Sequence, residues 1–442
     1  MSTKAFIKKI EKRTCNVAIV GIGYVGLPLL WRFHACEFPV IGFDIDQAKV
    51  DKFNAGKSYI KHIGEDKMTV LAESERAEAT TNFERISRTD AILLCVPTPL
   101  DEHREPDMTY VRGTVETIAP YLKQGQLIVL ESTTYPGTTE ELITPVCEEI
   151  SGLKSGKDFY LAYSPEREDP GNPDFSTQTI PKVVGGDSKP ARQIAEALYA
   201  AIIDHIVPVG NTRTAEAVKL LENIFRSVNI ALVNELKTVF DKMDIDVHEV
   251  IDTAATKPFG FMKFTPGPGL GGHCIPIDPF YLTWKAREVE MNTRFIELAG
   301  EVNTGMPQFV VDKTARALNA HKKPINGSQI LILGIAYKPN VDDMRESPAF
   351  PIMDKLKELG AEISYYDPYI PKISPTREHA EWTGSSSVTW DTASLQKYDA
   401  VVIVTDHDQV AYNDLVKYCP CIVDTRNVMS SYDTADGQVW KA

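Results

Sequence analysis

The stretch Val17–Pro28, VAIVGIGYVGLP, decides how the chain is expected to fold. The short run of apolar and β-branched residues before Gly21 is typical of a buried strand, and an apolar helical pattern begins at Gly26. In such a unit the first glycine makes the tight turn, the second (Gly23) lets a pyrophosphate approach the backbone, and the third allows the helix to pack on the strand. Free N–H groups at the helix N-terminus favour the phosphates. The stretch therefore predicts a dinucleotide-binding site.

An acidic residue ends the next expected strand. Asp44 lies 18 residues after Gly26. A carboxylate at this place accepts a hydrogen bond from the ribose 2′-hydroxyl and repels a 2′-phosphate, so NAD is favoured over NADP. Lys49 lies close by in the sequence and leaves that preference open. A glycine turn that binds nothing is the alternative.

With 442 residues, the chain is too long for one ordinary core, and two or three domains are expected. Strands and helices alternate along residues 1–205, which predicts an N-terminal Rossmann domain with a mostly parallel, doubly wound sheet. The expected strands are Asn16–Val20, Phe38–Asp44, Ala91–Val96, Leu127–Glu131 and Phe159–Tyr163.

A long amphipathic helix is expected from Thr214 to Met243, within a central helical domain of residues 206–322 that also contains a cysteine loop. At 1.5 Å per residue it would be about 45 Å long, so it is expected to bridge two domains. A second subunit is a candidate to cover its apolar face, which makes a homodimer the smallest assembly we expect. The apolar residues that recur at helical spacing are Val218, Leu221, Phe225, Val228, Leu232, Leu236 and Val239.

Alternation of strands and helices resumes at Ser328 and predicts a second doubly wound α/β domain over residues 323–442. Its first expected turn, LILGIAYK, contains only Gly334. A mononucleotide is therefore expected there rather than a second dinucleotide. Its expected strands are Gln329–Ile335, Glu362–Asp367, Ala400–Thr405 and Cys421–Asp424, with a helix over Pro351–Gly360.

The composition is that of an ordinary globular protein, with 43% hydrophobic and 24% charged residues. A net charge of −14 argues against nucleic acid or an anionic membrane as the main partner. Neither a secretory signal nor an apolar run of about 20 residues is visible, so a cytoplasmic location is expected. The seven cysteines are an odd number, which argues against a disulfide framework.

One cysteine departs from the default of a small buried hydrophobe. A glycine-rich loop, Gly267–Gly272, leads into Cys274, and Pro276 stands where a helix would begin. A thiolate is stabilised near a helix N-terminus, as a nucleophile requires, and Asp278 would project to the same side of that first turn. His273 is expected to be positional or to contact substrate. No metal-ligand spacing accompanies these residues.

Further candidates stand on the long helix and at two strand ends. Lys219 and Asn223 lie four residues apart, hence on one helical face, and both are suitable donors to an alkoxide or oxyanion, although a solvated lysine is the commoner reading. The turns Glu131–Gly137 and Ser164–Gly171 each follow a strand, at the edge where such sheets place ligands.

Taken together, these motifs resemble the UDP-glucose/GDP-mannose dehydrogenase family, and within it most resemble the UDP-N-acetylglucosamine 6-dehydrogenases. The motifs occur in family order over nearly the whole chain: GIGYVGLP, VPTPL, ESTTYPG, YSPEREDPGN, KLLEN, GPGLGGHCIPIDP and DDMRESPA. In the UDP-glucose branch an arginine before the cysteine loop enters a neighbouring subunit's sugar pocket. Lys257–Met262 contains no arginine, which fits a different sugar.

The resemblance implies a role for each matching residue. Cys274 would form a thiohemiacetal and then a thioester, Lys219 and Asn223 would stabilise the oxygen at C6, and Asp278 would orient or activate water. Glu166 would act as acid or base and Thr133 would lie beside C6 and the nicotinamide. The residues implied to contact the cofactor are Gly21, Gly23, Tyr24, Val25, Gly26, Asp44, Lys49, Pro97, Thr98, Ser132, Thr133 and Arg345. Those implied to contact the UDP-sugar are Glu166, Arg167, Lys219, Asn223, Gly271, His273 and Lys338.

The implied reaction is a four-electron oxidation of a UDP-hexose at C6 by NAD⁺, for the synthesis of a surface polysaccharide. A two-electron hydroxy-acid dehydrogenase would not need Cys274, and an inactive NAD-binding regulatory protein would not need Lys219 or Asp278. The sugar itself stays open among UDP-N-acetylglucosamine, UDP-N-acetylmannosamine, UDP-N-acetylgalactosamine and UDP-glucose, because epimers are distinguished by pocket shape.

Overall fold

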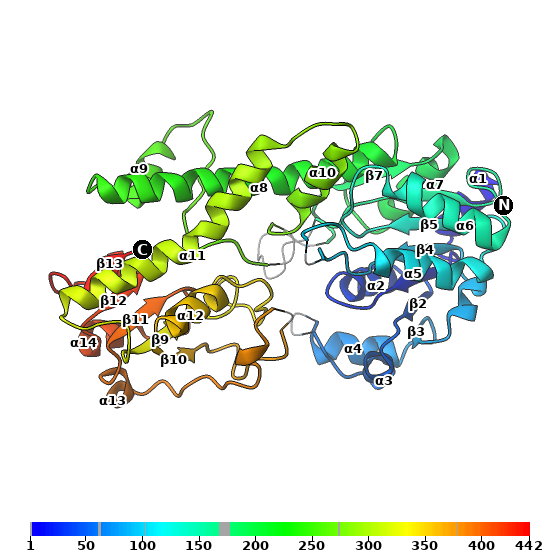
Figure 1. Cartoon of the computed structure of the whole chain (residues 1–442). Coiled ribbons are helices and arrows are strands. Elements are labelled where there is room, and N and C mark those ends of the chain that lie inside the picture. Colours follow the sequence, from blue (N-terminus) through cyan, green and yellow to red (C-terminus); the bar gives the residue numbers. More distant parts are fainter. Residues whose placement is uncertain (1, 61–62, 102, 168–176, 273–274, 377) are drawn as a thin grey trace. The chain divides into compact units, whose positions relative to one another are not determined.

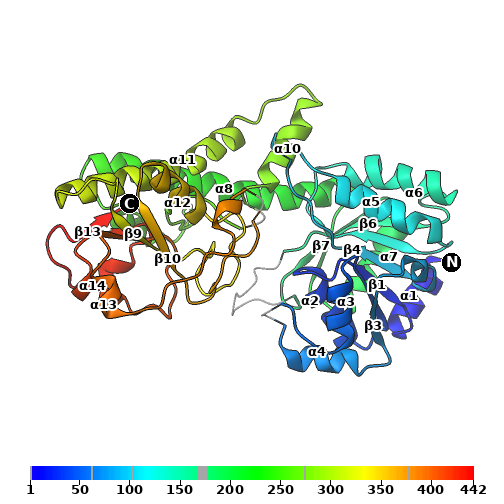
Figure 2. The ribbon, with the colours of Figure 1, turned by 60° about the horizontal axis from the view of Figure 1, so that its bottom comes forward.

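The computed structural model of the protein describes residues 2–60, 63–101, 103–167, 177–272, 275–376 and 378–442. The chain divides into two compact units, shown in Figures 1 and 2 and each considered by itself. Unit 1 comprises Met1–Glu222 and Phe280–Asn292, and unit 2 comprises Asn223–Pro279 and Thr293–Ala442. The expected central segment, residues 206–322, therefore contributes to both units.

Unit 1 is built on an eight-stranded sheet with the order β3-β2-β1-β4-β5-β6-β7-β8. Neighbouring strands are parallel except for β6 and β7, which pair antiparallel. All five strands expected here are present, one to three residues shorter than expected, whereas β3, β7 and β8 were not expected. The strands are β1 (Val17–Val20), β2 (Val40–Phe43), β3 (Ala77–Thr80), β4 (Ala91–Leu94), β5 (Leu127–Leu130), β6 (Tyr160–Tyr163), β7 (Lys182–Gly186) and β8 (Ile206–Pro208).

Helices cover both faces of this sheet because the central strands are apolar on both sides. In β1, Val17 and Ile19 pack into one core, while Ala18 and Val20 pack into the core on the opposite face. The first face is covered by α1 (Thr3–Glu11), α2 (Gly26–Ala35), α3 (Gln47–Asn54), α4 (Glu65–Ala72) and α7 (Lys189–Ala200), and the second by α5 (Thr109–Ile118) and α6 (Thr144–Ser151). The doubly wound architecture expected for this half is confirmed.

Unit 2 contains an all-parallel sheet with the order β10-β9-β11-β12-β13, again covered on both faces. Helices α11 and α12 supply one core, and α13 and α14 supply the other. The strands are β9 (Gln329–Leu333), β10 (Glu362–Tyr366), β11 (Ala400–Ile403), β12 (Ile422–Asp424) and β13 (Val439–Lys441). The helices are α9 (Val247–Ala254), α11 (Arg294–Ala320), α12 (Ala349–Glu358), α13 (Thr392–Leu395) and α14 (Tyr412–Tyr418).

The long helix α8 (Thr212–Lys242) starts in unit 1 and continues into unit 2, as the sequence predicted. Its burial differs from what the apolar pattern suggests, because much of the apolar stripe is exposed: Leu221 66%, Phe225 47%, Leu232 53% and Val239 45%. The buried side carries polar as well as apolar residues. The buried apolar residues are Ala215, Leu220, Ala231 and Val233, and the buried polar ones include Glu216, Lys219, Asn223, Ser227, Asn234 and Lys237. No helix in the described part of the chain is long and apolar enough to cross a bilayer.

Candidate active site

The glycine turn after β1 has the geometry that its three glycines predict. Gly21 has a φ of +90°, and a Cβ there would lie 2.5 Å from the carbonyl oxygen of Cys95. A Cβ on Gly26 would lie 1.9 Å from the carbonyl oxygen of Gly21, so α2 packs directly on the turn. A Cβ on Gly23 would meet nothing within 4 Å. The open space therefore lies where a pyrophosphate would approach the backbone, and Tyr24 beside it is partly exposed.

Asp44 follows β2 and is only 6% exposed. Its Oδ2 accepts a hydrogen bond from the N–H of Ile22 (3.2 Å), and its Oδ1 accepts one from the N–H of Asp46 (3.0 Å). The Nζ atom of Lys49 lies 3.5 Å from Oδ2, so this lysine is paired with the acid. The carboxylate is thereby held beside the glycine turn with accepting capacity left over for a ribose hydroxyl.

Two more expected cofactor loops meet at the same edge of the sheet, after β4 and β5. The hydroxyl of Ser132 donates to the carbonyl oxygen of Val96 at 2.6 Å, which ties the two loops together. Thr98 is buried, Pro97 is exposed and Thr133 is half-buried. These loops lie at the carboxyl ends of parallel strands, where doubly wound sheets bind their ligands.

Glu166, in the turn after β6, has a side chain that is 17% exposed. Its Oε1 accepts a hydrogen bond from the N–H of Arg167 (2.6 Å), and its Oε2 lies 3.6 Å from Nζ of Lys182. The guanidinium of Arg167 is paired with Glu222 at 2.7 Å. The structure thus describes Glu166 as a carboxylate beside a buried cation.

Lys219 lies on the buried side of α8 and is 8% exposed. Among the residues that the structure describes, it has no hydrogen-bond or ion-pair partner. A nearly buried ammonium without a counter-charge is costly unless a ligand or reacting group supplies one. A solvated helical lysine does not fit this burial.

Asn223 and Asp278 are brought together within unit 2. Each is 2% exposed, and Nδ2 of Asn223 donates to Oδ2 of Asp278 at 2.5 Å. Helix α10 (Asp278–Arg287) begins at the aspartate itself and not at Pro276, so the expected i, i+4 helical spacing before Asp278 is absent. The reason is that residues 275–277 form turns. Cys274 and His273 lie outside the described residues.

The glycine loop before that cysteine is closely packed where it is described. A Cβ on Gly271 or on Gly272 would lie 2.8 Å from the side chain of Tyr337. The N–H of Gly272 donates to the carbonyl oxygen of Arg345 at 3.1 Å. The glycines are therefore required by close approach to the loop that carries Lys338 and Arg345, all within unit 2.

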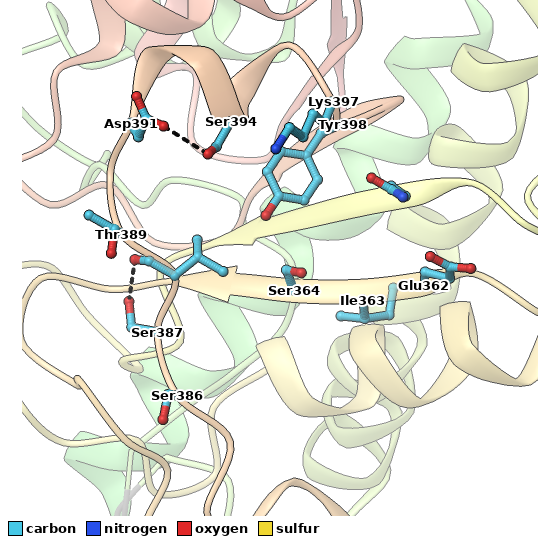
Figure 3. Close-up of a pocket in the computed structure, with 12 residues that line it drawn as sticks. Glu362, Ile363, Ser364, Ser386, Ser387, Thr389, Asp391, Ser394, Lys397 and Tyr398 are labelled. Carbon is cyan, nitrogen blue, oxygen red and sulfur yellow. Dashed lines mark hydrogen bonds between the residues drawn. The ribbon is translucent and has the colours of Figure 1, made fainter.

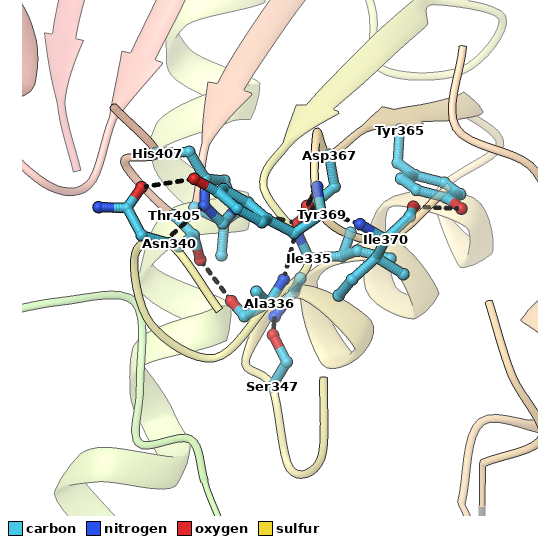
Figure 4. A network of polar contacts seen from close by, with 12 residues as sticks. Ile335, Ala336, Asn340, Ser347, Tyr365, Asp367, Tyr369, Ile370, Thr405 and His407 are labelled. Atoms are coloured by element: carbon cyan, nitrogen blue, oxygen red, sulfur yellow. Dashed lines mark hydrogen bonds and ion pairs between the residues drawn. The ribbon is translucent and has the colours of Figure 1, made fainter. Parts of the chain in front are cut away.

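Asp367, which follows β10, holds that loop in place through hydrogen bonds. Figure 4 shows that Asp367 contacts both the turn after β9 and the buried His407. The Nε2 atom of His407 lies 3.0 Å from Asp367, and the N–H of Asn340 donates to Nδ1 of the same ring at 3.0 Å. Although burial acts to raise the pKa of Asp367, the hydrogen bonds from His407 and from the N–H groups of Tyr369 and Ala336 outweigh it and lower that pKa. Lys338, two residues before Asn340, is half-buried.

A polar pocket in unit 2, shown in Figure 3, lies elsewhere on the domain. Its lining includes Gln329 and Glu362, the first residues of β9 and β10, and Lys397, which precedes β11. It therefore lies at the amino ends of the strands. Nucleotides bind doubly wound sheets at the carboxyl ends, so this pocket is not the candidate nucleotide site.

The candidate active site can now be compared with those of known protein families. The UDP-glucose/GDP-mannose dehydrogenase family matches through its NAD binding domain over residues 15–203, its central domain over 213–305 and its UDP binding domain over 331–431. The chain belongs to this family. It is therefore an NAD-dependent nucleotide-sugar dehydrogenase, and the predicted NAD cofactor and UDP-sugar partner are confirmed at that level.

Relatives of this dehydrogenase cover almost its full length. It is 35% identical to Protein CapL of Staphylococcus aureus over 94% of this chain and 96% of that one. It is also 35% identical to a UDP-N-acetyl-D-glucosamine 6-dehydrogenase of Pseudomonas aeruginosa, over 89% and 91%. Among solved structures, a UDP-D-ManNAc dehydrogenase from Pyrococcus horikoshii aligns with a TM-score of 0.87 and 31% identity, covering 96% of this chain and 98% of that chain.

Sequence reasoning missed several buried polar residues of the dehydrogenase. Glu216 on α8 accepts hydrogen bonds from the N–H groups of Gly137 (2.6 Å) and Thr139 (3.0 Å) and from the Thr139 hydroxyl (2.7 Å), which fixes the turn after β5. Lys182 and Glu131 form a buried ion pair. An available signal was the helical spacing of Glu216 with Lys219, which places both on one face of α8.

Proposed function

We propose that this dehydrogenase oxidises the C6 alcohol of UDP-N-acetylglucosamine to the carboxylate of UDP-N-acetylglucosaminuronate, with Cys274 as the covalent nucleophile. The product would supply a surface polysaccharide, and the reaction would take place in the cytoplasm. The observation that carries the proposal is the buried hydrogen bond between Asn223 and Asp278, because Asp278 lies four residues after Cys274 in the sequence.

The residues provide the parts that such a reaction needs. The ammonium of Lys219 and the amide of Asn223 are donors for an alkoxide or tetrahedral oxyanion at C6. The hydrogen bond from Asn223 holds the Asp278 carboxylate in one orientation, from which it can direct a water molecule. When bound, NAD⁺ accepts the hydride that leaves C6.

A thiol explains why oxidation would proceed to the acid. Addition of the Cys274 thiolate to the C6 aldehyde gives a thiohemiacetal, which still carries a C–H bond from which a second hydride can leave. Water then hydrolyses the resulting thioester and releases the thiol. Overall, one alcohol, two NAD⁺ and one water give one carboxylate, two NADH and three protons.

The choice of sugar rests on the sequence motifs and on the Pseudomonas aeruginosa relative, whose name specifies UDP-N-acetyl-D-glucosamine. The Pyrococcus horikoshii structure is of an enzyme for the C2 epimer, so the epimer must be measured. A panel of UDP-sugars should be assayed with NAD⁺, counting NADH formed per sugar consumed. Fastest turnover of UDP-N-acetylglucosamine with two NADH per sugar supports the proposal. Faster turnover of an epimer would show that the epimer is the substrate, and one NADH per sugar would contradict the covalent mechanism.

The nucleophile has its own test. Cys274→Ser should bind NADH as the wild type does but form no uronate, because an alkoxide is a poor replacement for the thiolate and for the thioester leaving group. Uronate production at the wild-type rate by this variant would contradict the role of Cys274.

We also propose that the dehydrogenase is a homodimer that covers the exposed apolar stripe of α8. Leu221, Phe225, Leu232 and Val239 together present an apolar surface that a lone chain would leave in water. Light scattering after gel filtration should give twice the chain mass, and Leu232→Glu should shift the protein toward the monomer. A monomeric wild type would refute this part.

A further inference from the structure

A buried ion pair stands beside the candidate acid–base residue of unit 1. The Nζ atom of Lys182, the first residue of β7, lies 2.6 Å from Oε2 of Glu131, the residue that follows β5. The side chains are 6% and 0% exposed. The hydroxyl of Tyr199 on α7 donates to the other oxygen of Glu131, and its ring centroid lies 5.4 Å from the Lys182 ammonium. Three elements therefore hold the ammonium in one place.

Lys182 also points at a second carboxylate. Its Nζ lies 3.6 Å from Oε2 of Glu166, and the N–H of Glu166 approaches the carbonyl oxygen of Glu131 at 3.4 Å. An ammonium has three N–H donors, so one can remain with Glu131 while another is directed at Glu166. The cation is thus shared between a fully buried acid and one that is still partly accessible.

Among the residues that the structure describes, Cys95, Tyr199 and Arg167 add no compensating charge to this cluster. Burial raises the pKa of the Cys95 thiol and of the Tyr199 phenol, so both are neutral. Arg167, next to Glu166, is paired with Glu222 on α8. Although burial disfavours the Lys182 ammonium, the two carboxylates raise its pKa above the ordinary value, so it remains a cation.

Charge counting shows what the lysine does for its neighbours. With both acids ionised, the cluster of Glu131, Lys182 and Glu166 carries one net negative charge. Without the lysine, two carboxylates would face each other at a buried site, and one of them would hold a proton. Without Glu131, the ammonium would serve Glu166 alone and would make it a weaker base.

We propose that Lys182, held by Glu131 and Tyr199, is a positioning residue that keeps Glu166 ionised yet basic enough to accept a proton during oxidation at C6. This inference rests on the proposed function and on the acid–base role that the family resemblance implies for Glu166. A purely structural ion pair would need only Glu131 and Lys182; the approach of the same ammonium to Glu166 is the feature that a structural role leaves unexplained.

The test uses two substitutions with effects of opposite sign on the pKa of Glu166. Lys182→Met removes the cation and should raise that pKa by about one unit or more, whereas Glu131→Gln removes the competing carboxylate and should lower it. The pKa is read from the ¹³C NMR titration of enzyme labelled at glutamate side-chain carboxyls, with the Glu166 signal identified by its absence from Glu166→Gln. The acid limb of kcat/KM against pH should move in the same directions.

Two further variants keep the test interpretable. Lys182→Met leaves the buried Glu131 carboxylate without a counter-charge, which can prevent this single variant from folding. The double variant Glu131→Gln/Lys182→Met leaves neither of these buried charges and covers that case. The double variant should also raise the pKa of Glu166. Lys154→Met breaks the exposed pair with Glu148 in the same unit and should move neither the titration nor the pH profile.

The outcomes separate the two proposals. The role of Lys182 is overturned if its loss leaves the pKa of Glu166 unchanged. It is also overturned if that pKa shifts in the same direction in both single variants. Both outcomes hold whether or not the enzyme turns over. Shifts in the titration with no matching shift in the pH profile would also overturn it, since Glu166 would not limit the reaction. Absence of NADH from wild-type enzyme with every UDP-sugar would instead refute the proposed function.

Discussion

Two glycines three residues apart in the turn after β1 should respond to the same substitution in opposite ways. Gly23→Ala adds a methyl group to open space, whereas Gly26→Ala adds one to the contact between α2 and the turn. We predict that Gly23→Ala folds normally and binds NAD weakly. Gly26→Ala should instead lose stability. The pair separates the ligand-binding role of the turn from its packing role.

The expected magnitudes follow from the distances. Ordinary contact with a Cβ begins near 3.4 Å, so a Cβ only 1.9 Å from the carbonyl oxygen of Gly21 would push α2 back by about 1.5 Å. It would also lie 3.0 Å from Cγ2 of Ile19. Such overpacking costs about 1–3 kcal/mol or more, and the better helix propensity of alanine recovers at most about 1 kcal/mol. At Gly23 the free energy of unfolding should change by less than about 0.5 kcal/mol.

Urea unfolding and NADH titration measure the two effects without any assumption about the sugar. Gly26→Ala should lower the free energy of unfolding by about 2 kcal/mol. Gly23→Ala should weaken NADH binding at least about tenfold, which corresponds to about 1.4 kcal/mol. Wild-type NADH affinity in Gly23→Ala would show that the open space is not the pyrophosphate site, and wild-type stability in Gly26→Ala would show that the close packing is not real.

Three further substitutions test other contacts. Glu216→Ala removes the acceptor of three hydrogen bonds from the turn after β5 and should lower the free energy of unfolding by about 3 kcal/mol in urea; an unchanged midpoint would show that the turn does not depend on it. The pKa of Asp367 is lowered on folding, so its contribution to stability is present above its unfolded pKa and is lost as the pH falls through its folded pKa. Asp367→Asn should therefore be less stable than the wild type at pH 7 but lose less free energy of unfolding between pH 7 and pH 3. An equal loss of free energy of unfolding in both proteins would contradict the pairing with His407. Asn223→Ala should reduce kcat about 100-fold or more with NADH binding intact. An unaffected kcat would show that Asn223 and its hydrogen bond to Asp278 do not contribute to catalysis.

Local patterns in the sequence were sufficient for the architecture. Parallel strands buried on both faces are continuous apolar runs, so β1, β4 and β5 could be recognised from a few residues each. Strands β3, β7, β8 and β13 were missed. β3 has only one buried position, Ala79. β7 includes two glycines and begins with a charged residue, and β8 and β13 are only three residues long with no fully buried position.

The missing information about the site concerns long-range partners. Lys182 looks like an ordinary surface lysine until Glu131, 51 residues away, is known to face it. Likewise, the close packing of Gly271 depends on Tyr337, which no local pattern connects to it. For α8 the apolar period was read correctly, but an apolar stripe does not say whether the same chain or another covers it.

The two α/β halves show why hydrogen-bond accounting identifies a ligand site better than position in the fold. Asp44 and Asp367 each follow the second strand of their sheet, beside the turn after the first strand. A carboxylate has about four lone-pair sites. Asp44 accepts from two backbone N–H groups and is paired with Lys49, so it can still accept from a ribose hydroxyl. Asp367 accepts from four backbone N–H groups and faces His407, so it has no site left. The two acids therefore differ in what they can still bind: Asp44 keeps capacity for a ribose hydroxyl, as expected in an NAD domain, whereas Asp367 is used up in holding a loop.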